Sequence, residues 1–197
     1  MKLFNYRKFY DRDSLSINDV GDDPIEFFKK WFKDAEGSDG IIEPNAMTIS
    51  TVEDNVPSSR VVLLKEIKDR SLVFFTNYDS NKGRAISNNP NLCASFYWPS
   101  LERQVIFKGT AKKSDKNYSD LYFSSRPFNS QAAAIVSNQS KITPRTVNTF
   151  IERTSDNRKD LEKIYRLRYS IPEGSTLAAE PINGFVIQDS ASIIDDS

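Results

Sequence analysis

The sequence contains no histidine among its 197 residues and only one cysteine, Cys93. The absence of histidine excludes Ser-His-Asp and Cys-His catalysis, together with every zinc site that uses imidazole. A single cysteine cannot form a disulfide within the chain and suits a reducing compartment, so we expect a cytoplasmic protein. Because Cys93 lies in the apolar stretch LCASFYW, we expect it to pack rather than to react. An enzyme with this composition would take its difficult chemistry from a bound organic cofactor.

An excess of charge of either sign is also missing. Lys and Arg number 27, and so do Asp and Glu, so no overall field attracts nucleic acid or an anionic membrane. No apolar run approaches the roughly 20 residues that cross a bilayer, and the first residues lack the apolar core of a signal peptide. The length fits one domain with a substantial core. We therefore expect a single domain over residues 1–197 that binds neither nucleic acid nor membrane.

The N-terminal part of the chain predicts an arm and a helix. Residues 1–22 are charged and aromatic without clear periodicity, which predicts an extended arm. Residues 23–38 predict a helix, because Asp23 is a candidate N-cap, Pro24 takes the first helical position and Gly37 can end it. The apolar side chains of this segment fall on one face, so the helix should pack on an apolar surface.

The middle of the chain, residues 45–113, predicts barrel strands. Short segments rich in β-branched and aromatic residues alternate there with turns; the strands are expected at 46–52, 59–67, 71–77, 92–98 and 103–113. A short helix begins after Ser80. Residues 114–170 predict a helical region, and residues 183–188 predict a last strand. This pattern favours a mainly β fold, either an antiparallel barrel or a sandwich.

Two cations, Arg60 and Lys65, bracket the apolar run VVLL. An unpaired charge taken out of water is costly, so each requires an anionic partner. Side chains alternate along an ideal strand, so residues five apart point to opposite faces. The two cations could serve two ends of an extended ligand or two ligands, or they could form ordinary ion pairs with nearby acids such as Glu66 and Asp69.

Three further segments carry groups suited to phosphate or to a ring. Lys82 lies in the first turn of a helix, whose free N–H groups and partial positive charge attract anions. Arg126 precedes a proline-containing turn with serine hydroxyls around it, a common way to hold phosphate. Gln104 is a polar residue within an apolar strand, and residues 137–140 (SNQS) offer uncharged donors. Each signal alone is weak.

Together, the motifs RVVLLK, FFTNYDSNK, LERQV, YFSSRP with a following SQ, and SNQS, in this order, resemble the pyridoxine/pyridoxamine 5′-phosphate oxidase family. The opening YRKFY and the segment DDPIEFFKKWF resemble the N-terminal arm and first helix of that family. The resemblance covers residues 5–142 strongly and 143–187 loosely. It implies an antiparallel split β-barrel with flanking helices, of the FMN-binding type, that shares its sites between the two chains of a homodimer.

The resemblance also implies two sets of binding residues. The positions that match the FMN site are Arg60, Val61, Val62, Leu63, Leu64, Lys65, Phe75, Thr76, Lys82, Gln104, Gln139 and Ser140. The positions that match the substrate site are Arg7, Tyr10, Lys65, Tyr122, Arg126 and Ser130, of which the first two belong to the arm. We assign no catalytic side chain and no metal ligand.

The implied reaction is the oxidation of pyridoxine or pyridoxamine 5′-phosphate to pyridoxal 5′-phosphate, with FMN as cofactor and oxygen as acceptor. The chain departs from the family pattern at Asn81, where an arginine is usual, and at Ile182, where a tryptophan is usual. It also ends at Ser197 without the family's C-terminal arginine and histidine segment. From these departures we expect FMN binding to be kept and oxidase activity to be weakened or lost.

Three other readings stay open. The chain could be another flavin oxidoreductase on the same barrel, which would bind FMN without selectivity for the pyridoxal group. It could instead bind FMN or pyridoxal phosphate as a carrier or sensor, without oxidase activity. It could also be a β-barrel whose cations form ordinary ion pairs. Flavin binding, substrate selectivity and oxygen consumption distinguish these readings from one another.

Overall fold

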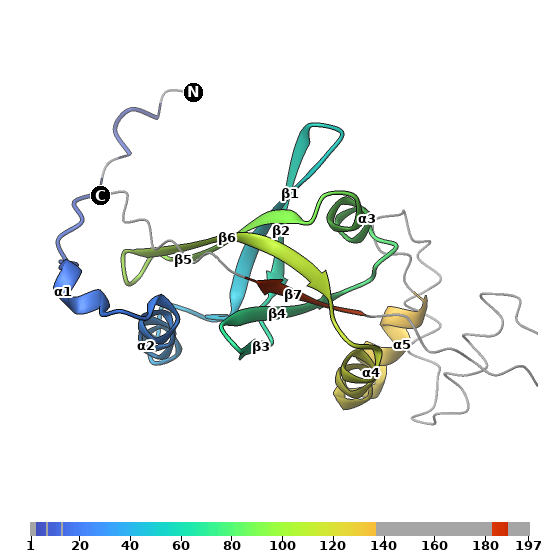
Figure 1. Ribbon diagram of the computed structural model, residues 1–197. Coiled ribbons are helices and arrows are strands. Elements are labelled where there is room, and N and C mark those ends of the chain that lie inside the picture. Colours follow the sequence, from blue (N-terminus) through green and yellow to red (C-terminus); the bar gives the residue numbers. More distant parts are fainter. Residues whose placement is uncertain (1–2, 7, 13, 137–182, 189–197) are drawn as a thin grey trace, which may run out of the picture.

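A computed structural model describes residues 3–6, 8–12, 14–136 and 183–188 (Figure 1). Within these ranges the helices are α1 (Ile17–Val20), α2 (Pro24–Glu36), α3 (Asn81–Asn88), α4 (Lys116–Ser125) and α5 (Phe128–Val136). The strands are β1 (Ala46–Glu53), β2 (Val56–Leu63), β3 (Glu66–Lys68), β4 (Ser71–Thr76), β5 (Asn91–Trp98), β6 (Arg103–Lys113) and β7 (Asn183–Gln188). The mainly β architecture expected from the sequence is confirmed.

The strands form one sheet of seven, in the order β2-β1-β5-β6-β7-β4-β3, and every pair is antiparallel. The sheet curves, so that β2, the strand at one edge, approaches β4, the strand next to the other edge. The last strand, at residues 183–188, was expected from the sequence, and it pairs with both β4 and β6. It therefore joins the two halves of the sheet.

The expected single strand over residues 59–67 is wrong, because the chain changes its partner there. β2 pairs with β1, whereas β3 pairs with β4. At the junction, Leu64 N donates to Asn45 O at 2.8 Å, and Lys65 N donates to Val73 O at 2.8 Å. This change of partner separates Lys65 from the alternation of β2, so the argument that Arg60 and Lys65 must face opposite ways does not apply.

The helix α2 covers one end of the sheet and completes the core. Asp23 caps it by accepting from Ile25 N at 2.9 Å, as the sequence predicts. Its Phe28 is fully buried, and the Phe28 ring centroid lies 5.0 Å from that of Phe96 and 4.9 Å from that of Phe107. Burial of such aromatic side chains supplies much of the stabilisation of a domain of this size.

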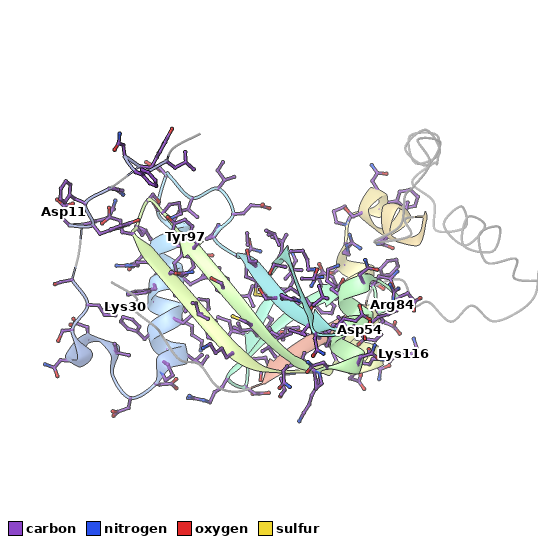
Figure 2. All side chains as sticks on the ribbon, turned by 90° about the horizontal axis from the view of Figure 1, so that it is seen from above. Asp11, Lys30, Asp54, Arg84, Tyr97 and Lys116 are labelled. Atoms are coloured by element: carbon purple, nitrogen blue, oxygen red, sulfur yellow. The ribbon has the colours of Figure 1, made fainter. Side chains whose placement is uncertain are left out.

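The N-terminal arm is not wholly extended. It contains the one-turn helix α1, which begins with a capping box: Ser16 Oγ accepts from Asn18 N, and the Asp19 carboxylate accepts from Ser16 N. Arm, α1 and α2 lie at one end of the molecule, and α3, α4 and α5 lie at the other (Figure 1). Figure 2 agrees, with Asp11 and Tyr97 at one end and Arg84 and Lys116 at the other.

The helical region expected over residues 114–170 is present as α4 and α5 up to residue 136, and its remainder lies outside the described residues. The assignment of all residues to a single domain stays a prediction. In the described part of the chain, no helix has both the length and the apolar character needed to cross a membrane.

Candidate functional site

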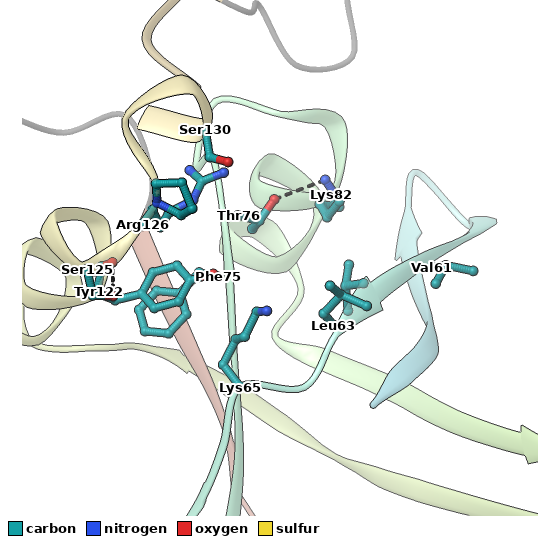
Figure 3. A pocket seen from close by; sticks show the side chains of 12 residues that line it. Val61, Leu63, Lys65, Phe75, Thr76, Lys82, Tyr122, Ser125, Arg126 and Ser130 are labelled. Atoms are coloured by element: carbon teal, nitrogen blue, oxygen red, sulfur yellow. Dashed lines mark hydrogen bonds between the residues drawn. The ribbon is translucent and has the colours of Figure 1, made fainter. Parts of the chain in front are cut away.

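A cavity of about 510 Å³ opens at the end of the molecule that carries α3, α4 and α5 (Figure 3). One wall consists of the end of β2, a second of the end of β4 with the first turn of α3, and a third of the end of α4 with the turn into α5. Three cationic side chains line it, namely Lys65, Lys82 and Arg126. Among the described residues, no carboxylate lines it, so the cavity is built for anionic ligands.

Lys82 occupies the wall formed by α3 and β4. Its side chain is only 7% exposed, and its Nζ donates to Thr76 Oγ1 at 2.9 Å. Burial, and secondly the charge of Arg60, lower the pKa of Lys82 to about 8. The helix begins at Ser80, whose Oγ accepts from Gly83 N at 3.2 Å. A buried ammonium beside a helix N-terminus is a suitable site for phosphate.

Arg60 does not line the cavity, but its charge contributes to the lowered pKa of Lys82. Its guanidinium donates to Thr51 Oγ1 at 2.8 Å and to Ser58 Oγ at 2.8 Å, and burial lowers its pKa. Within the described residues neither Arg60 nor Lys65 forms an ion pair with a carboxylate. The structure therefore gives no support to ordinary ion pairing with Glu66 or Asp69 as the reason for these cations.

The β2 wall presents aliphatic side chains together with Lys65. Val61, Val62 and Leu63 line the cavity, and Val61 is 65% exposed although it is apolar. Lys65 follows at the junction with β3, and its side chain points toward the space between Phe75 and Leu63 (Figure 3). Exposed apolar side chains beside a flexible cation favour a ligand that is partly planar and partly charged.

The opposite wall combines an aromatic pair with Arg126. The rings of Phe75 and Tyr122 are stacked, with centroids 3.7 Å apart and planes 9° apart. Arg126 Nη1 is buried, and it has no hydrogen-bond partner among the described residues. Burial lowers the pKa of Arg126 and raises that of Tyr122, although the arginine charge opposes the second effect. Ser130, on the first turn of α5, lies near the guanidinium (Figure 3).

Several residues expected at the sites lie elsewhere in the described chain. Leu64 is buried in the core and does not line the cavity. Gln104 lies at the start of β6, away from the cavity, and its Nε2 donates to Ser95 Oγ at 3.3 Å. Tyr10 is 71% exposed on the N-terminal arm. Three more expected site residues lie outside the described residues, namely Arg7, Gln139 and Ser140.

Other cavity residues were not assigned from the sequence. Ser125 and Pro127 line the cavity on either side of Arg126. Both belong to the motif YFSSRP, so this motif could have indicated them as site residues. Asn81, where the resemblance leads us to expect arginine, accepts from Arg84 Nη2 at 2.6 Å through its Oδ1. The exposed Arg84 therefore supplies a positive charge next to Asn81, where the expected arginine is absent.

The described chain has no group of three or more His, Cys, Asp or Glu side chains placed to bind a metal ion. What the cavity offers is two cationic regions joined by aliphatic and aromatic walls. One region is formed by Lys82 with Thr76, the other by Arg126 with Ser130, and Lys65 lies on the wall beside them. Such an arrangement can bind and orient phosphorylated ring compounds.

Comparison with known proteins identifies relatives. A family model described as "Pyridoxamine 5'-phosphate oxidase" matches residues 34–153. The chain is 55% identical over 141 residues to the pyridoxine/pyridoxamine 5′-phosphate oxidase of Flavobacterium psychrophilum, covering 71% of this chain and 66% of that protein. It is 48% identical over 161 residues to the enzyme of that name from Flavobacterium johnsoniae, covering 81% and 73%. The chain thus spans about two thirds to three quarters of these relatives.

Two solved structures share the fold. PhzG from Burkholderia lata 383, in complex with tetrahydrophenazine-1-carboxylic acid, gives a TM-score of 0.68 at 22% identity, covering 89% of this chain and 82% of that chain. A pyridoxamine 5′-phosphate oxidase-related, FMN-binding protein from Nostoc punctiforme gives 0.60 at 13% identity, covering 84% and 81%. These similarities confirm the expected split-barrel fold with flanking helices.

Proposed function

The chain belongs to the pyridoxamine 5′-phosphate oxidase family, and we propose that it binds FMN and oxidises pyridoxine or pyridoxamine 5′-phosphate to pyridoxal 5′-phosphate, with oxygen as acceptor. The observation that carries this proposal is the cavity itself. It has cationic groups on separate walls, Lys82 on one and Arg126 on another, and no described lining carboxylate. Two phosphorylated ligands bound side by side would give each of these cationic groups a phosphate partner.

The residues of the Lys82 wall fit an FMN phosphate. The ammonium, the Thr76 hydroxyl and the N-terminus of α3 offer donors to one anion, and the charge of Arg60 reinforces them. The aliphatic side chains of Val61 and Leu63 offer an apolar surface to a ring system. When bound, FMN supplies the acceptance of a hydride and the return of electrons to oxygen.

We assign the substrate phosphate to the wall of α4 and α5. Arg126 carries a buried Nη1 that lacks a partner in the described chain, which fits an anion supplied by a ligand. Ser130 and Tyr122 add hydroxyl donors to the same wall, and Lys65 adds a second cation. The task of these side chains is to bind and orient the substrate so that its reacting carbon faces the cofactor.

The remaining expected site residues support a shared site in a homodimer. Gln104 pairs with Tyr97, which lies at the end of the molecule opposite Arg84 in Figure 2. Tyr10 belongs to the arm segment whose Lys8 forms an ion pair with Glu102, two residues from Gln104. A single chain cannot bring Gln104 and Tyr10 to its own cavity without a large rearrangement. We therefore assign Gln104 to the flavin ring, and Arg7 and Tyr10 to the substrate, of the partner's cavity. FMN affinity should then depend on protein concentration.

A second candidate is an FMN-binding protein without oxidase activity. It is favoured by Asn81, which removes an arginine that the family usually places beside the phosphate lysine, and which accepts from Arg84 instead. Under this reading the FMN phosphate is still bound, but substrate turnover is absent. Retention of flavin without its reduction by pyridoxamine 5′-phosphate would support it.

The experiment that tests the proposal is an anaerobic titration of purified, FMN-loaded protein with pyridoxamine 5′-phosphate. We expect the flavin absorbance band at about 450 nm to bleach on addition of substrate and to return on admission of oxygen. A matched titration with unphosphorylated pyridoxamine should bleach the band far more slowly, because Arg126 has no phosphate to bind. Flavin that stays oxidised with both compounds would contradict the oxidase reading.

A further inference from the structure

Gly184 lies at a crowded junction of three elements next to the cavity. It pairs with Phe75 across β7 and β4. Its N–H donates to the Oγ of the buried Ser119 on α4 at 3.0 Å. Its carbonyl accepts from Ser114 N at 2.7 Å and from the Tyr78 hydroxyl at 2.7 Å. The backbone of β7 at Gly184 is thus hydrogen-bonded to α4 through Ser119, to the turn after β6 through Ser114, and to the segment after β4 through Tyr78.

The missing side chain of Gly184 leaves room for the Phe75 ring. A Cβ at position 184 would lie 2.9 Å from Phe75 Cε1 and would overlap with Ser114 Oγ. Any other residue here would therefore displace the ring or the Ser114 turn. Because the Phe75 ring also stacks on the Tyr122 ring, with centroids 3.7 Å apart, a displaced Phe75 ring would displace Tyr122 as well.

The helix α4 carries both Ser119, which accepts from Gly184 N, and the cavity residue Tyr122. Ser119, which binds Gly184, precedes Tyr122 by one turn of α4, and Arg126 follows at the C-cap of that helix. Ser119 Oγ also lies 2.9 Å from Ser114 Oγ, so the start of the helix is fixed to the same junction. The position of the phosphate-binding wall therefore depends on how α4 sits on Gly184.

We propose that Gly184 is a positioning residue: with Ser119 it fixes the Phe75–Tyr122 pair and so holds Arg126 at the place that the substrate phosphate requires. The identity of the substrate in this inference rests on the proposed function. The claim that Gly184 and Ser119 fix the Phe75–Tyr122 pair does not depend on it. Gly184 does not line the cavity, so any effect on the ligand acts through Phe75 and α4. The residue therefore affects mainly how well a phosphorylated pyridine fits, because none of the Gly184 contacts described above involves Lys82 or α3.

The first test is Gly184→Ala, compared with Gly37→Ala, where a Cβ meets nothing closer than 3.7 Å. We expect the KM for pyridoxamine 5′-phosphate to rise about tenfold, since small misplacements of binding groups carry large effects. The dissociation constant of FMN should change by a smaller factor, because Gly184 contacts Phe75 but neither Lys82 nor α3. A Gly184→Ala protein with the KM of Gly37→Ala would overturn the proposal.

A second variant keeps the test decisive if Gly184→Ala does not fold. Ser119→Ala removes the acceptor of the Gly184 N–H without adding atoms, and Ser38→Ala, whose hydroxyl lies 3.3 Å from Ser100 Oγ away from the cavity, is its control. We expect Ser119→Ala to raise the KM as well, with a smaller effect on FMN affinity. A KM equal to that of Ser38→Ala would contradict the role of the junction.

A spectroscopic measurement separates this inference from the proposed function. Stacking on Phe75 should shift the Tyr122 ring protons upfield in the NMR spectrum, and Tyr122→Phe identifies their signals. We expect Gly184→Ala and Ser119→Ala to reduce this shift, and the two control variants to keep it. If the wild type showed no turnover, the oxidase proposal would fail, and unchanged Tyr122 shifts in both junction variants would still overturn the positioning role.

Discussion

The ammonium of Lys82 donates a 2.9 Å hydrogen bond to the hydroxyl of Thr76 and lies almost wholly out of solvent. In the described chain it has a hydroxyl partner but no carboxylate partner, and the nearby Arg60 adds to the positive charge. Burial of a charge without a counter-ion is unfavourable, so the arrangement destabilises the ligand-free protein. An anionic ligand removes this unfavourable contribution when it binds.

Replacement of Lys82 by methionine should weaken FMN binding by roughly ten- to a hundredfold. The physical reason is the loss of a charge-assisted hydrogen bond, worth about 1.5–3 kcal/mol. Equilibrium titration followed by flavin fluorescence measures the change. Lys30→Met, on the exposed surface of α2, is the control, and equal affinities of the two variants would exclude Lys82 from the phosphate site.

The affinity for FMN should fall as the pH rises through 8. Lys82 has a pKa of about 8, below its ordinary value, because of burial and of the Arg60 charge. The protonated form, which attracts the phosphate, therefore predominates below pH 8 and is lost above it. Affinity measured between pH 7 and 9.5 should show this decline in the wild type, whereas Lys82→Met should give a flat profile in this range.

The same pKa shift gives a prediction for stability without ligand. Between pH 8 and the ordinary lysine pKa of 10.5, the unfolded chain holds the Lys82 proton and the folded chain does not. Since the unfolded state then binds more protons, the Lys82 contribution to the free energy of unfolding becomes more favourable as pH rises. Denaturant titrations of wild type and Lys82→Met at pH 7.5 and 9.5 should show the difference between the proteins shrinking at the higher pH.

Replacement of Arg126 by methionine should have opposite effects on stability and on activity. Removal of a buried N–H that lacks a partner in the described chain should stabilise the ligand-free protein by about 1–3 kcal/mol. The KM for pyridoxamine 5′-phosphate should rise, because the substrate phosphate loses its guanidinium. The control is Arg70→Met, which removes only an exposed ion pair with Asp23. An unchanged KM in Arg126→Met would place the substrate phosphate elsewhere.

Glu102→Gln should release the N-terminal arm. Glu102 forms an ion pair with Lys8 at 2.5 Å and accepts from Arg12 N at 3.1 Å, and these contacts lower its pKa. Without the carboxylate charge, trypsin should cleave after Lys8 and Arg12 sooner, which mass spectrometry of timed digests detects. Added salt should speed cleavage of the wild type, since the Lys8 side of the ion pair is exposed to screening ions, and should change the variant little. Equal cleavage rates in low salt would show that the arm is bound by other contacts.

Local signals in the sequence were sufficient for much of the fold. The caps of α2 at Asp23 and Gly37, the β-branched strands and the start of α3 at Ser80 depend on neighbouring residues and were predicted. The junction at Leu64 was not, because the chain there exchanges β1 for β4 as its partner, and neither contact is local. The helix α1 was missed because four residues show no periodicity, although Ser16 and the acid three residues later are a capping signal.

The candidate site divides in the same way. Lys65, Lys82 and Arg126 were predicted from motifs, and the structure brings all three to one cavity. Gly184 was not predicted as part of the site, because its importance depends on the register that sets it opposite Phe75. The sequence indicates which residues can bind phosphate, but the residues that orient them are found only when strands far apart along the chain are paired.

The concentration of positive charge in the cavity has a consequence for handling the protein. Inorganic phosphate and sulfate carry the same charges as the phosphate groups of the proposed ligands, so either ion in a buffer will compete for the region around Lys82 and that around Arg126. Cofactor loading should therefore be most complete in a buffer whose anions are large and singly charged. Precipitation with ammonium sulfate should accordingly lower the flavin content of the protein.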